Sequence, residues 1–204
     1  MLIEEKEAEK ILKRYKIPIC ISKICNSKKD VFSCKIEFPI VLKALSPKII
    51  HKTDSGAVIV GIKNKTELRM AFEKFKKFGE INYLIQKQEE GKEIIIGMKR
   101  DAQFGPVILF GLGGVFVEVF KDVSFRIAPL SKKDIYEMIN EIKAIKILKG
   151  FRGEKSVNLD KVSDILSKLS VLSLKEKHIS EIDFNPVIVN ETRAVVVDAR
   201  LIKD

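Results

Sequence analysis

The sequence predicts an α+β protein made of two lobes that join near residues 86–92. Short apolar runs typical of buried strands alternate with amphipathic stretches typical of helices. Four of the runs follow one another closely between residues 93 and 128, with short joints containing Gly or Asp, as in an antiparallel meander. The polar segment KQEEGK at 87–92 separates this meander from the elements before it.

The predicted first lobe, residues 1–86, begins with a helix over residues 3–15, whose apolar residues recur at helical spacing. An amphipathic helix is predicted over 64–78, with Asn64 or Thr66 as its N-terminal cap. Residues 26–35 are polar and ambiguous. The predicted strands of this lobe cover residues 18–24, 38–45, 57–62 and 81–86.

The predicted second lobe, residues 87–204, contains the meander and the end of the chain. The strands of the meander cover residues 93–100, 105–111, 115–120 and 124–128. A helix over 131–148 is expected to start at Ser131 as a cap, with Asp134 three residues later. A second amphipathic helix covers 159–177, and ISEIDFNPVIVN pairs with AVVVDARLI in a last hairpin.

The composition is that of a soluble globular protein, with 46% hydrophobic and 32% charged residues. The formal net charge is +10, from 38 basic and 28 acidic residues, which permits nucleic-acid binding. The lysines are spread along the chain instead of clustered, so we do not expect a nucleic-acid partner. No apolar run approaches the roughly 20 residues of a membrane span.

The cysteines and the N-terminus indicate a cytoplasmic protein. The first fifteen residues are charged and helical in pattern, unlike a signal peptide. Cys20, Cys25 and Cys34 form no CxxC pair and have no histidine nearby, so zinc binding is not expected. Free thiols in a reducing compartment are the simpler interpretation.

His51 is one of only two histidines and lies in the polar segment SPKIIHKTDSGAV between two apolar runs. A neutral imidazole is nucleophilic near pH 7 and can accept a phosphoryl group. The neighbouring Lys52, Thr53 and Ser55 could donate hydrogen bonds to phosphate. By itself this position favours a solvated loop histidine.

Lys43 lies inside the apolar run FPIVLKAL, where an unpaired charge is costly. Its ammonium group either extends from the end of a strand into water or reaches into a cleft and binds phosphate. Position alone favours neither interpretation.

The C-terminal hairpin carries a set of oxygen ligands. Glu181, Asp183 and Asn185 alternate along one predicted strand, so their side chains are expected on the same face. Asp198 interrupts the apolar run of the second strand. Carboxylate and amide oxygens on one sheet face suit Mg²⁺ that also binds nucleotide phosphates.

The glycine-rich segment FGLGGVFVE at 110–118 is not followed by a helical pattern, so it does not predict a dinucleotide-binding or P-loop motif. Gly113 and Gly114 are expected in a tight turn. Four basic residues nearby are individually weak candidates for lining a phosphate cleft: Lys99, Arg100, Lys121 and Arg126.

Three blocks together resemble the ATP-grasp subunit of ADP-forming acetyl-CoA synthetases, which are relatives of succinyl-CoA synthetase. These blocks are FPIVLKALSPKIIHKTDSGAV, GKEIIIGMKRDAQFGPVILFGLGGVFVEVFKDVSFRIAPL and EIDFNPVIV with AVVVDAR. The resemblance covers nearly the whole chain and implies an ATP-grasp fold, with ATP or ADP and Mg²⁺ held between two lobes.

The resemblance also implies roles for individual residues. His51 resembles the phosphate-accepting loop histidine, and Lys43 resembles the lysine that contacts the nucleotide phosphates. Asn185 and Asp198 resemble the Mg²⁺ ligands, with Asp183 beside them. The segment from Gln86 through Glu90, which includes Gln88 and Glu89, resembles the hinge that binds adenine by backbone hydrogen bonds. Glu93 resembles the acid near the ribose. Ala57 departs from the family pattern, which often has a second glycine there.

The resemblance implies that this chain works with a separate CoA-binding alpha subunit, because no CoA-binding segment and no second active-site histidine loop is recognisable. An α2β2 assembly is expected. The alternatives are a nucleotide subunit of the succinate–CoA ligase type that uses GDP, a non-catalytic ATP-binding regulator, and a basic nucleic-acid-binding protein.

Overall fold

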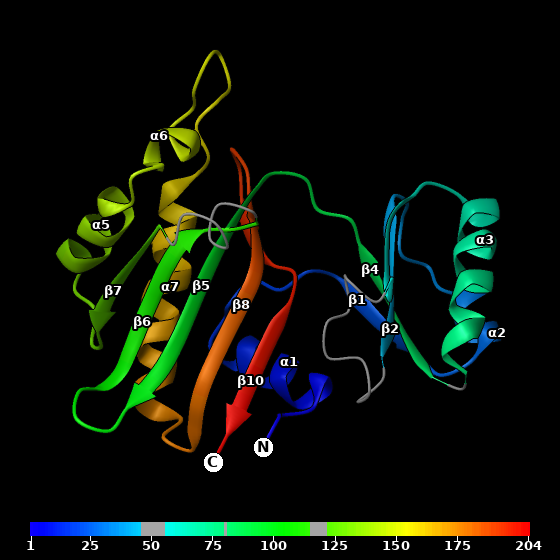
Figure 1. Cartoon of the computed structure of the whole chain (residues 1–204), viewed down its shortest axis with the longest axis horizontal. Helices are drawn as coiled ribbons and strands as arrows, with labels where there is room; N and C mark the ends of the chain where they lie inside the picture. The colour runs from blue at the N-terminus through cyan, green and yellow to red at the C-terminus, as the bar shows by residue number, and fades with distance from the viewer. Residues whose placement is uncertain (46–55, 80, 115–121) are drawn as a thin grey trace. The chain divides into compact units, whose positions relative to one another are not determined.

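The computed structural model describes residues 1–45, 56–79, 81–114 and 122–204, which form two compact units (Figure 1). The larger unit comprises Met1–Ile19 and Glu90–Asp204. Its strands are β5 (Lys92–Asp101), β6 (Gly105–Leu112), β7 (Val123–Ile127), β8 (Ile179–Val189), β9 (Ala194–Val196) and β10 (Ala199–Lys203). Its helices are α1 (Glu5–Arg14), α5 (Lys132–Glu141), α6 (Ile145–Leu148) and α7 (Leu159–Lys175).

The strands of the larger unit form one antiparallel sheet in the order β10-β8-β5-β6-β7, with β9 paired to β8. Helices α1, α5 and α7 pack on one face of this sheet; α1 and α7 lie behind it in Figure 1. The core forms between the helices and that face, because alternate strand residues such as Ile96, Phe110 and Phe184 point towards the helices. The opposite face, which we call the open face, carries the other residues of each strand.

The smaller unit, Cys20–Glu89, is an α+β layer of its own. Its elements are β1 (Ser22–Cys25), α2 (Lys28–Phe32), β2 (Ile40–Leu45), β3 (Val58–Ile62), α3 (Lys65–Phe75), the short 3₁₀ helix η1 (Lys76–Phe78) and β4 (Asn82–Lys87). The sheet order is β1-β4-β2-β3, and all pairs are antiparallel. Phe72 and Phe75 of α3 pack against Leu42 and Ile85 in its core.

Most of the predicted elements are present. The α+β class and the antiparallel meander are confirmed, and Asn64 caps α3 by accepting a hydrogen bond from the Glu67 amide at 2.9 Å. The ambiguous stretch 26–35 contains the short helix α2, capped by Ser27. The predicted strand over 115–120 lies outside the described residues.

The division into units differs from the predicted lobes, 1–86 and 87–204, at the N-terminus. The chain passes from the smaller unit back into the larger one between Glu89 and Glu90, close to the predicted boundary. Met1–Ile19, however, belong to the larger unit. The reason is long-range pairing: the Ile3 amide donates to the Leu201 carbonyl at 2.9 Å, and α1 packs on β10. Ile3, Ile11 and Leu12 thereby join the core of the larger unit.

The single helix predicted over 131–148 is divided into α5 and α6. Ile142 has extended backbone angles, φ −65° and ψ 133°, which end α5. The carboxylate of Asp122 accepts hydrogen bonds from the amides of Lys143 and Ala144, both at 2.8 Å. This acceptor replaces the intrahelical carbonyls that a continuous helix would offer to those amides.

The three cysteines are free thiols, as predicted. Burial, followed by the neighbouring Cys34, raises the pKa of Cys25 to about 11. A thiol with a raised pKa carries little thiolate at neutral pH and is correspondingly unreactive.

Ser131→Ala is expected to lower the free energy of unfolding by about 1 kcal/mol at neutral pH, because Ser131 and Asp134 cap α5 reciprocally. The Ser131 hydroxyl, together with the Ser131 amide, lowers the pKa of Asp134. The part of the cap in which the Ser131 hydroxyl donates to the Asp134 carboxylate therefore exists above the ordinary aspartate pKa and disappears as the pH falls through the lowered value. Urea unfolding at pH 7 and in acid should show a difference from the parent that narrows in acid.

Ser163→Ala is the control for this measurement, because the Ser163 hydroxyl only donates to the Leu159 carbonyl within α7. It should change stability by less than about 0.5 kcal/mol at either pH. Equal effects of the two substitutions would contradict the capping interpretation.

Candidate functional site

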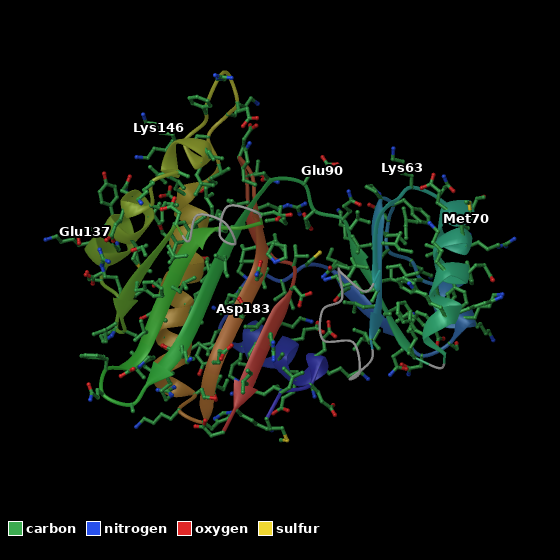
Figure 2. All side chains as sticks on the ribbon, in the orientation of Figure 1. Lys63, Met70, Glu90, Glu137, Lys146 and Asp183 are labelled. Atoms are coloured by element: carbon green, nitrogen blue, oxygen red, sulfur yellow. The ribbon has the colours of Figure 1, made fainter. Side chains whose placement is uncertain are left out.

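The open face of the six-stranded sheet carries the acidic residues predicted for a metal. Ile182 and Phe184 of β8 are buried in the core, so Glu181, Asp183 and Asn185 between and beside them point to the open face, as the alternation predicted. Figure 2 labels Asp183 on β8, which lies next to β10 in the sheet.

Asp198 lies close to this set, between β9 and β10. Its carbonyl accepts the Asn185 amide at 3.1 Å. The pKa of Asp183 is raised, first by burial and then by the charges of Glu181 and Asp198, while Arg200 opposes the shift. The carboxylates therefore repel one another, and a bound cation would relieve that repulsion.

The donor set fits Mg²⁺ only as a partial coordination shell. Within the four described ranges, no group of three or more His, Cys, Asp or Glu side chains is already arranged to hold a metal ion. Mg²⁺ in nucleotide sites usually takes one or two carboxylates and completes its octahedron with phosphate and water. The chemistry of Asn185, Asp198 and Asp183 suits that mode of binding and does not suit a closed protein cage.

Two residues that lie beside Asp183 were not predicted from the sequence. Cross-strand register places Gly97 of β5 on one side of Asp183 and Arg200 of β10 on the other. A glycine there leaves the sheet surface next to the carboxylate free of a side chain. The register of paired strands was needed to find both residues, since neither is near Asp183 in the sequence.

Glu93 is exposed at the start of β5 and is held by the glycine pair that ends β6. The Gly113 amide donates to the Glu93 carbonyl at 2.8 Å. A Cβ atom on Gly113 would lie 2.9 Å from the Glu93 Cβ atom, and Gly114 has φ +64°. Only glycine permits so close an approach, so the pair fixes the place of Glu93 at the start of the central strand β5.

In the smaller unit, Lys43 and Gln86, which were both predicted to contact the nucleotide, lie on the same face of the sheet. Register pairs Lys43 with Leu84 and Val41 with Gln86, while Leu42 and Ile85 point to the helices. Lys43 is 5% exposed and Gln86 is 3% exposed, although this is the face without helices of their own unit. Both predicted nucleotide contacts thus lie on the side opposite α2 and α3.

The segment that follows β4 is held by many hydrogen bonds. The Gln88 backbone amide donates a hydrogen bond to the Pro39 carbonyl at 3.0 Å. The side-chain Oε1 atom of Gln88 accepts one from the Gly61 amide at 2.6 Å. The Lys87 carbonyl accepts a hydrogen bond from the Cys20 thiol at 3.1 Å, and the Glu90 carbonyl accepts one from Asn190. The Gln88 side chain therefore supports β3. Glu89 is the last residue of the smaller unit.

Arg100 lies away from the open face and has a structural explanation. Its guanidinium donates to the carbonyls of Ser173, Glu176 and Ile179, at 2.7 to 3.3 Å, around the C-terminal end of α7. These contacts satisfy terminal helix carbonyls and place a cation at the negative end of the helix dipole. The prediction that Arg100 lines a phosphate cleft has no support from its position on the helix-covered face. Arg126 similarly binds Glu141 of α5.

His51, Lys52 and Thr53 lie outside the described residues. The strands that flank them are described: β2 ends at Leu45, and the Ala44 amide donates to the Ala57 carbonyl at 2.8 Å just before β3. Leu45 and Ala57 therefore lie at the same end of the four-stranded sheet.

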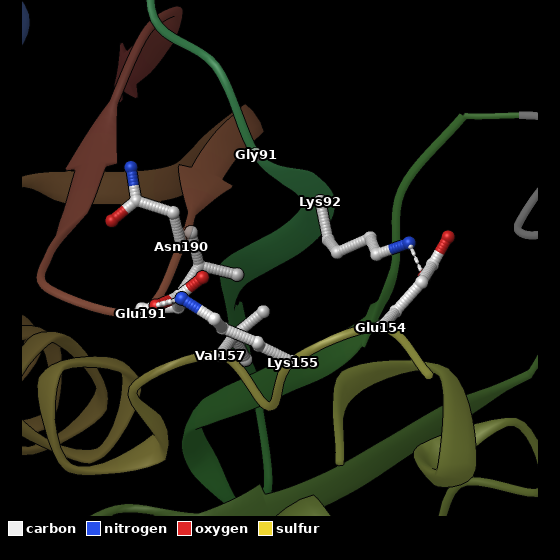
Figure 3. A pocket seen from close by; sticks show the side chains of 8 residues that line it. Gly91, Lys92, Glu154, Lys155, Val157, Asn190 and Glu191 are labelled. Carbon is white, nitrogen blue, oxygen red and sulfur yellow. Dashed lines mark hydrogen bonds and ion pairs between the residues drawn. The ribbon is translucent and has the colours of Figure 1, made fainter. Parts of the chain in front are cut away.

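A shallow pocket at the start of β5 involves none of the predicted site residues (Figure 3). It is lined by Gly91, Lys92, Glu154, Lys155, Val157, Val189, Asn190 and Glu191. Lys92 pairs with Glu154, and Lys155 pairs with Glu191 at 2.9 Å. Because its lysines already have acidic partners, the pocket offers little attraction to an anion. Among the described helices, none is long and apolar enough to cross a membrane.

The comparisons with known proteins match nearly the whole chain. Residues 1–202 match the model of the family described as ATP-grasp domain. Acetate–CoA ligase [ADP-forming] I subunit beta of Pyrococcus furiosus is 46% identical over 97% of this chain and 90% of its own length. Acetate–CoA ligase [ADP-forming] I of Archaeoglobus fulgidus is 42% identical over 91% of this chain, which spans only 28% of that relative.

One solved structure adds information about the nucleotide site of a relative. It is Ca. Korarchaeum cryptofilum dinucleotide-forming acetyl-coenzyme A synthetase 1 in complex with coenzyme A and Mg-AMPPCP, with the phosphohistidine segment pointing towards the nucleotide-binding site. It matches with a TM-score of 0.87 and 43% identity, over 100% of this chain and 93% of that chain.

Proposed function

The chain belongs to the ATP-grasp family, and we propose from this premise that it is the nucleotide-binding beta subunit of an ADP-forming acyl-CoA synthetase. The observation that carries the proposal is the match to the Pyrococcus subunit beta, at 46% identity over 97% of this chain. The reaction is acyl-CoA + ADP + phosphate ⇌ carboxylate + ATP + CoA. The partner is a CoA-binding alpha subunit, in an α2β2 assembly in the cytoplasm, without nucleic acid or membrane.

His51 is the proposed phosphate carrier of this chain. Its neutral imidazole attacks phosphorus in a phosphoryl group supplied by the partner, and a P–N bond forms as the bond to the leaving group breaks. In the second step an oxygen of the ADP β-phosphate forms the new P–O bond, and the P–N bond breaks. The electron pair of the P–N bond returns to the ring nitrogen, which regenerates the neutral imidazole. Lys52 and Thr53 donate to the phosphoryl oxygens.

The proposed nucleotide site consists of Lys43, Gln86, Gln88, Glu89 and Glu93. The ammonium group of Lys43 compensates phosphate charge, in keeping with its place on the helix-free face of the smaller sheet. Asn185 and Asp198, with Asp183 beside them, would hold Mg²⁺, which neutralises charge on the nucleotide phosphates. Arg100 is left out because its donors serve the end of α7.

The isolated chain is expected to bind ADP but to form no acyl-CoA from carboxylate, ATP and CoA. The reason is that the proposed acyl and CoA chemistry belongs to the partner; this chain matches 28% of the length of the Archaeoglobus relative. Calorimetry with Mg-ADP and a thiol-consumption assay with the purified chain test this directly.

Adding the purified CoA-binding subunit is the matched arm of this experiment and should restore turnover. Acyl-CoA synthesis by the chain alone would overturn the division of labour between subunits. Absence of any nucleotide binding in the isolated chain and in the complex would overturn the proposed function itself.

A further inference from the structure

Five apolar residues form a continuous surface on the open face of the larger unit, along its last two strands. We call this surface the edge patch; it consists of Val107 and Leu109 of β6 with Val123, Phe125 and Ile127 of β7. Register pairs Val107 with Ile127 and Leu109 with Phe125. Phe125 is 52% exposed and Ile127 is 50% exposed, which is unusual for large apolar residues of a strand.

The contacts of the intervening residues fix the direction of the edge patch. Ser124 is buried, and its hydroxyl donates to Glu141 of α5 at 2.8 Å. Arg126 forms an ion pair with the same carboxylate at 2.9 Å. Because Ser124 and Arg126 face the helices, alternation turns Val123, Phe125 and Ile127 to the open face.

Four of the five residues of the edge patch lie in the same two rows of the sheet as the acidic residues of the candidate site. One row runs Arg200, Asp183, Gly97, Leu109 and Phe125 across the five main strands. The next row contains Glu181, Lys99, Val107 and Ile127. One continuous face therefore leads from the proposed metal ligands to the apolar edge.

The edge strand itself is open to further contacts. In the described part of the chain, β7 pairs only with β6 and ends the path of the sheet. Native proteins usually shield an edge strand with charges, proline or a covering segment. The outward residues of β7 are instead all apolar, a composition typical of a surface that another protein covers.

We propose that the edge patch is a docking surface for the CoA-binding subunit. This inference rests on the proposed function, in which the partner must deliver phosphate to the face that holds the nucleotide. The Archaeoglobus relative extends far beyond the 28% of its length that this chain matches. A surface continuous with the site on the same face is one that such a partner can cover while it reaches the site.

Charge favours this partner over a second copy of the chain. The net charge is +10, so two copies of the chain repel one another overall. Lys99 lies between the acidic residues and the patch and is exposed. The partner surface should therefore be apolar at its centre and acidic at its rim.

The test measures association of the purified chain with the purified CoA-binding subunit from the same organism, by calorimetry. Phe125→Asp and Ile127→Asp should each weaken association at least ten-fold and leave ADP binding by the isolated chain unchanged. Tyr136→Asp is the matched control: Tyr136 is 69% exposed on α5, on the helix side of the unit, and its substitution should change association less than two-fold. Circular dichroism should show the same fold for all three variants.

Three results would overturn the proposal. The first is undiminished association of both patch variants. The second is loss of ADP binding in them, which would place the patch in the nucleotide site. The third is a parent chain that is dimeric in light scattering and becomes monomeric on substitution while still binding the partner, which would make the patch a contact between copies. Failure of the parent chain to bind ADP contradicts the proposed function instead, and unaltered association contradicts only the docking surface.

Discussion

Replacing His51 with alanine should abolish acyl-CoA turnover by the assembled enzyme, by a factor on the order of 10³ or more. The imidazole is the proposed acceptor of the phosphoryl group, and alanine has no atom that can form the P–N bond. With labelled ATP and Mg²⁺, the parent complex should carry an acid-labile, base-stable phosphate on this chain, and the His51→Ala complex should carry none. Mg-ADP affinity should stay within about 1 kcal/mol of the parent value, because the imidazole serves transfer more than docking.

His178→Ala is the control for this measurement, since the sequence contains only two histidines. The His178 ring lies beside Glu176, with its Nδ1 atom 3.8 Å from the carboxylate, in the turn between α7 and β8. Its loss should leave labelling and turnover near the parent values. Near-normal turnover of His51→Ala would mean that phosphate passes directly from the partner to ADP, and His51 would then be an ordinary loop residue.

Asp198→Asn and Asn185→Ala should each weaken Mg-ADP binding by about 1–3 kcal/mol, or about 5- to 150-fold in Kd. The first change removes a charge that attracts the cation, and the second removes a neutral oxygen ligand. Titration calorimetry with and without Mg²⁺ separates the metal from the nucleotide: affinity for ADP in the absence of Mg²⁺ should change much less than affinity for Mg-ADP.

Asp160→Asn provides a charge-matched control on the first turn of α7, where the side chain is exposed. It should leave Mg-ADP affinity unchanged. Parent-like affinity in both Asp198→Asn and Asn185→Ala would remove these residues from the proposed metal site.

Local chemistry was enough to predict many of the elements. The cap of α3 at Asn64 and the reciprocal cap of Ser131 with Asp134 follow from residue types at fixed offsets. The alternation of Glu181, Asp183 and Asn185 with buried apolar residues also predicted which side chains share a sheet face. Such features depend on neighbours within a few residues, which a sequence displays directly.

Features that depend on distant contacts could not be predicted in the same way. The helix α1 joins the larger unit only because Ile3 pairs with Leu201 at the far end of the chain. The break after α5 depends on Asp122, which accepts the amides of Lys143 and Ala144. Arg100 lies in a run that alternates like its neighbours, and only the position of α7 determines what its guanidinium binds.

Only part of the candidate site could therefore be predicted from the sequence. The shared face of Asp183 and Asn185 follows from a two-residue period, whereas Gly97 beside Asp183 follows from strand register. From the residues alone, His51 could be either a phosphate acceptor or a solvated loop histidine. The family resemblance favours phosphate transfer. Its segment lies outside the described residues, so the labelling experiment is the decisive measurement for it.

The insertion of the smaller unit between Ile19 and Glu90 also determines the order in which the two cores can form during synthesis. Every strand and helix of the smaller unit has left the ribosome soon after Glu89 has been made, and its sheet contacts are comparatively local. The larger unit must wait, because Leu2 bridges to Ile202 and the Lys203 amide donates to the Met1 carbonyl. The apolar face of α1 thus stays without its native partner during most of translation, and this helix is the segment on which a nascent-chain chaperone would be expected to act.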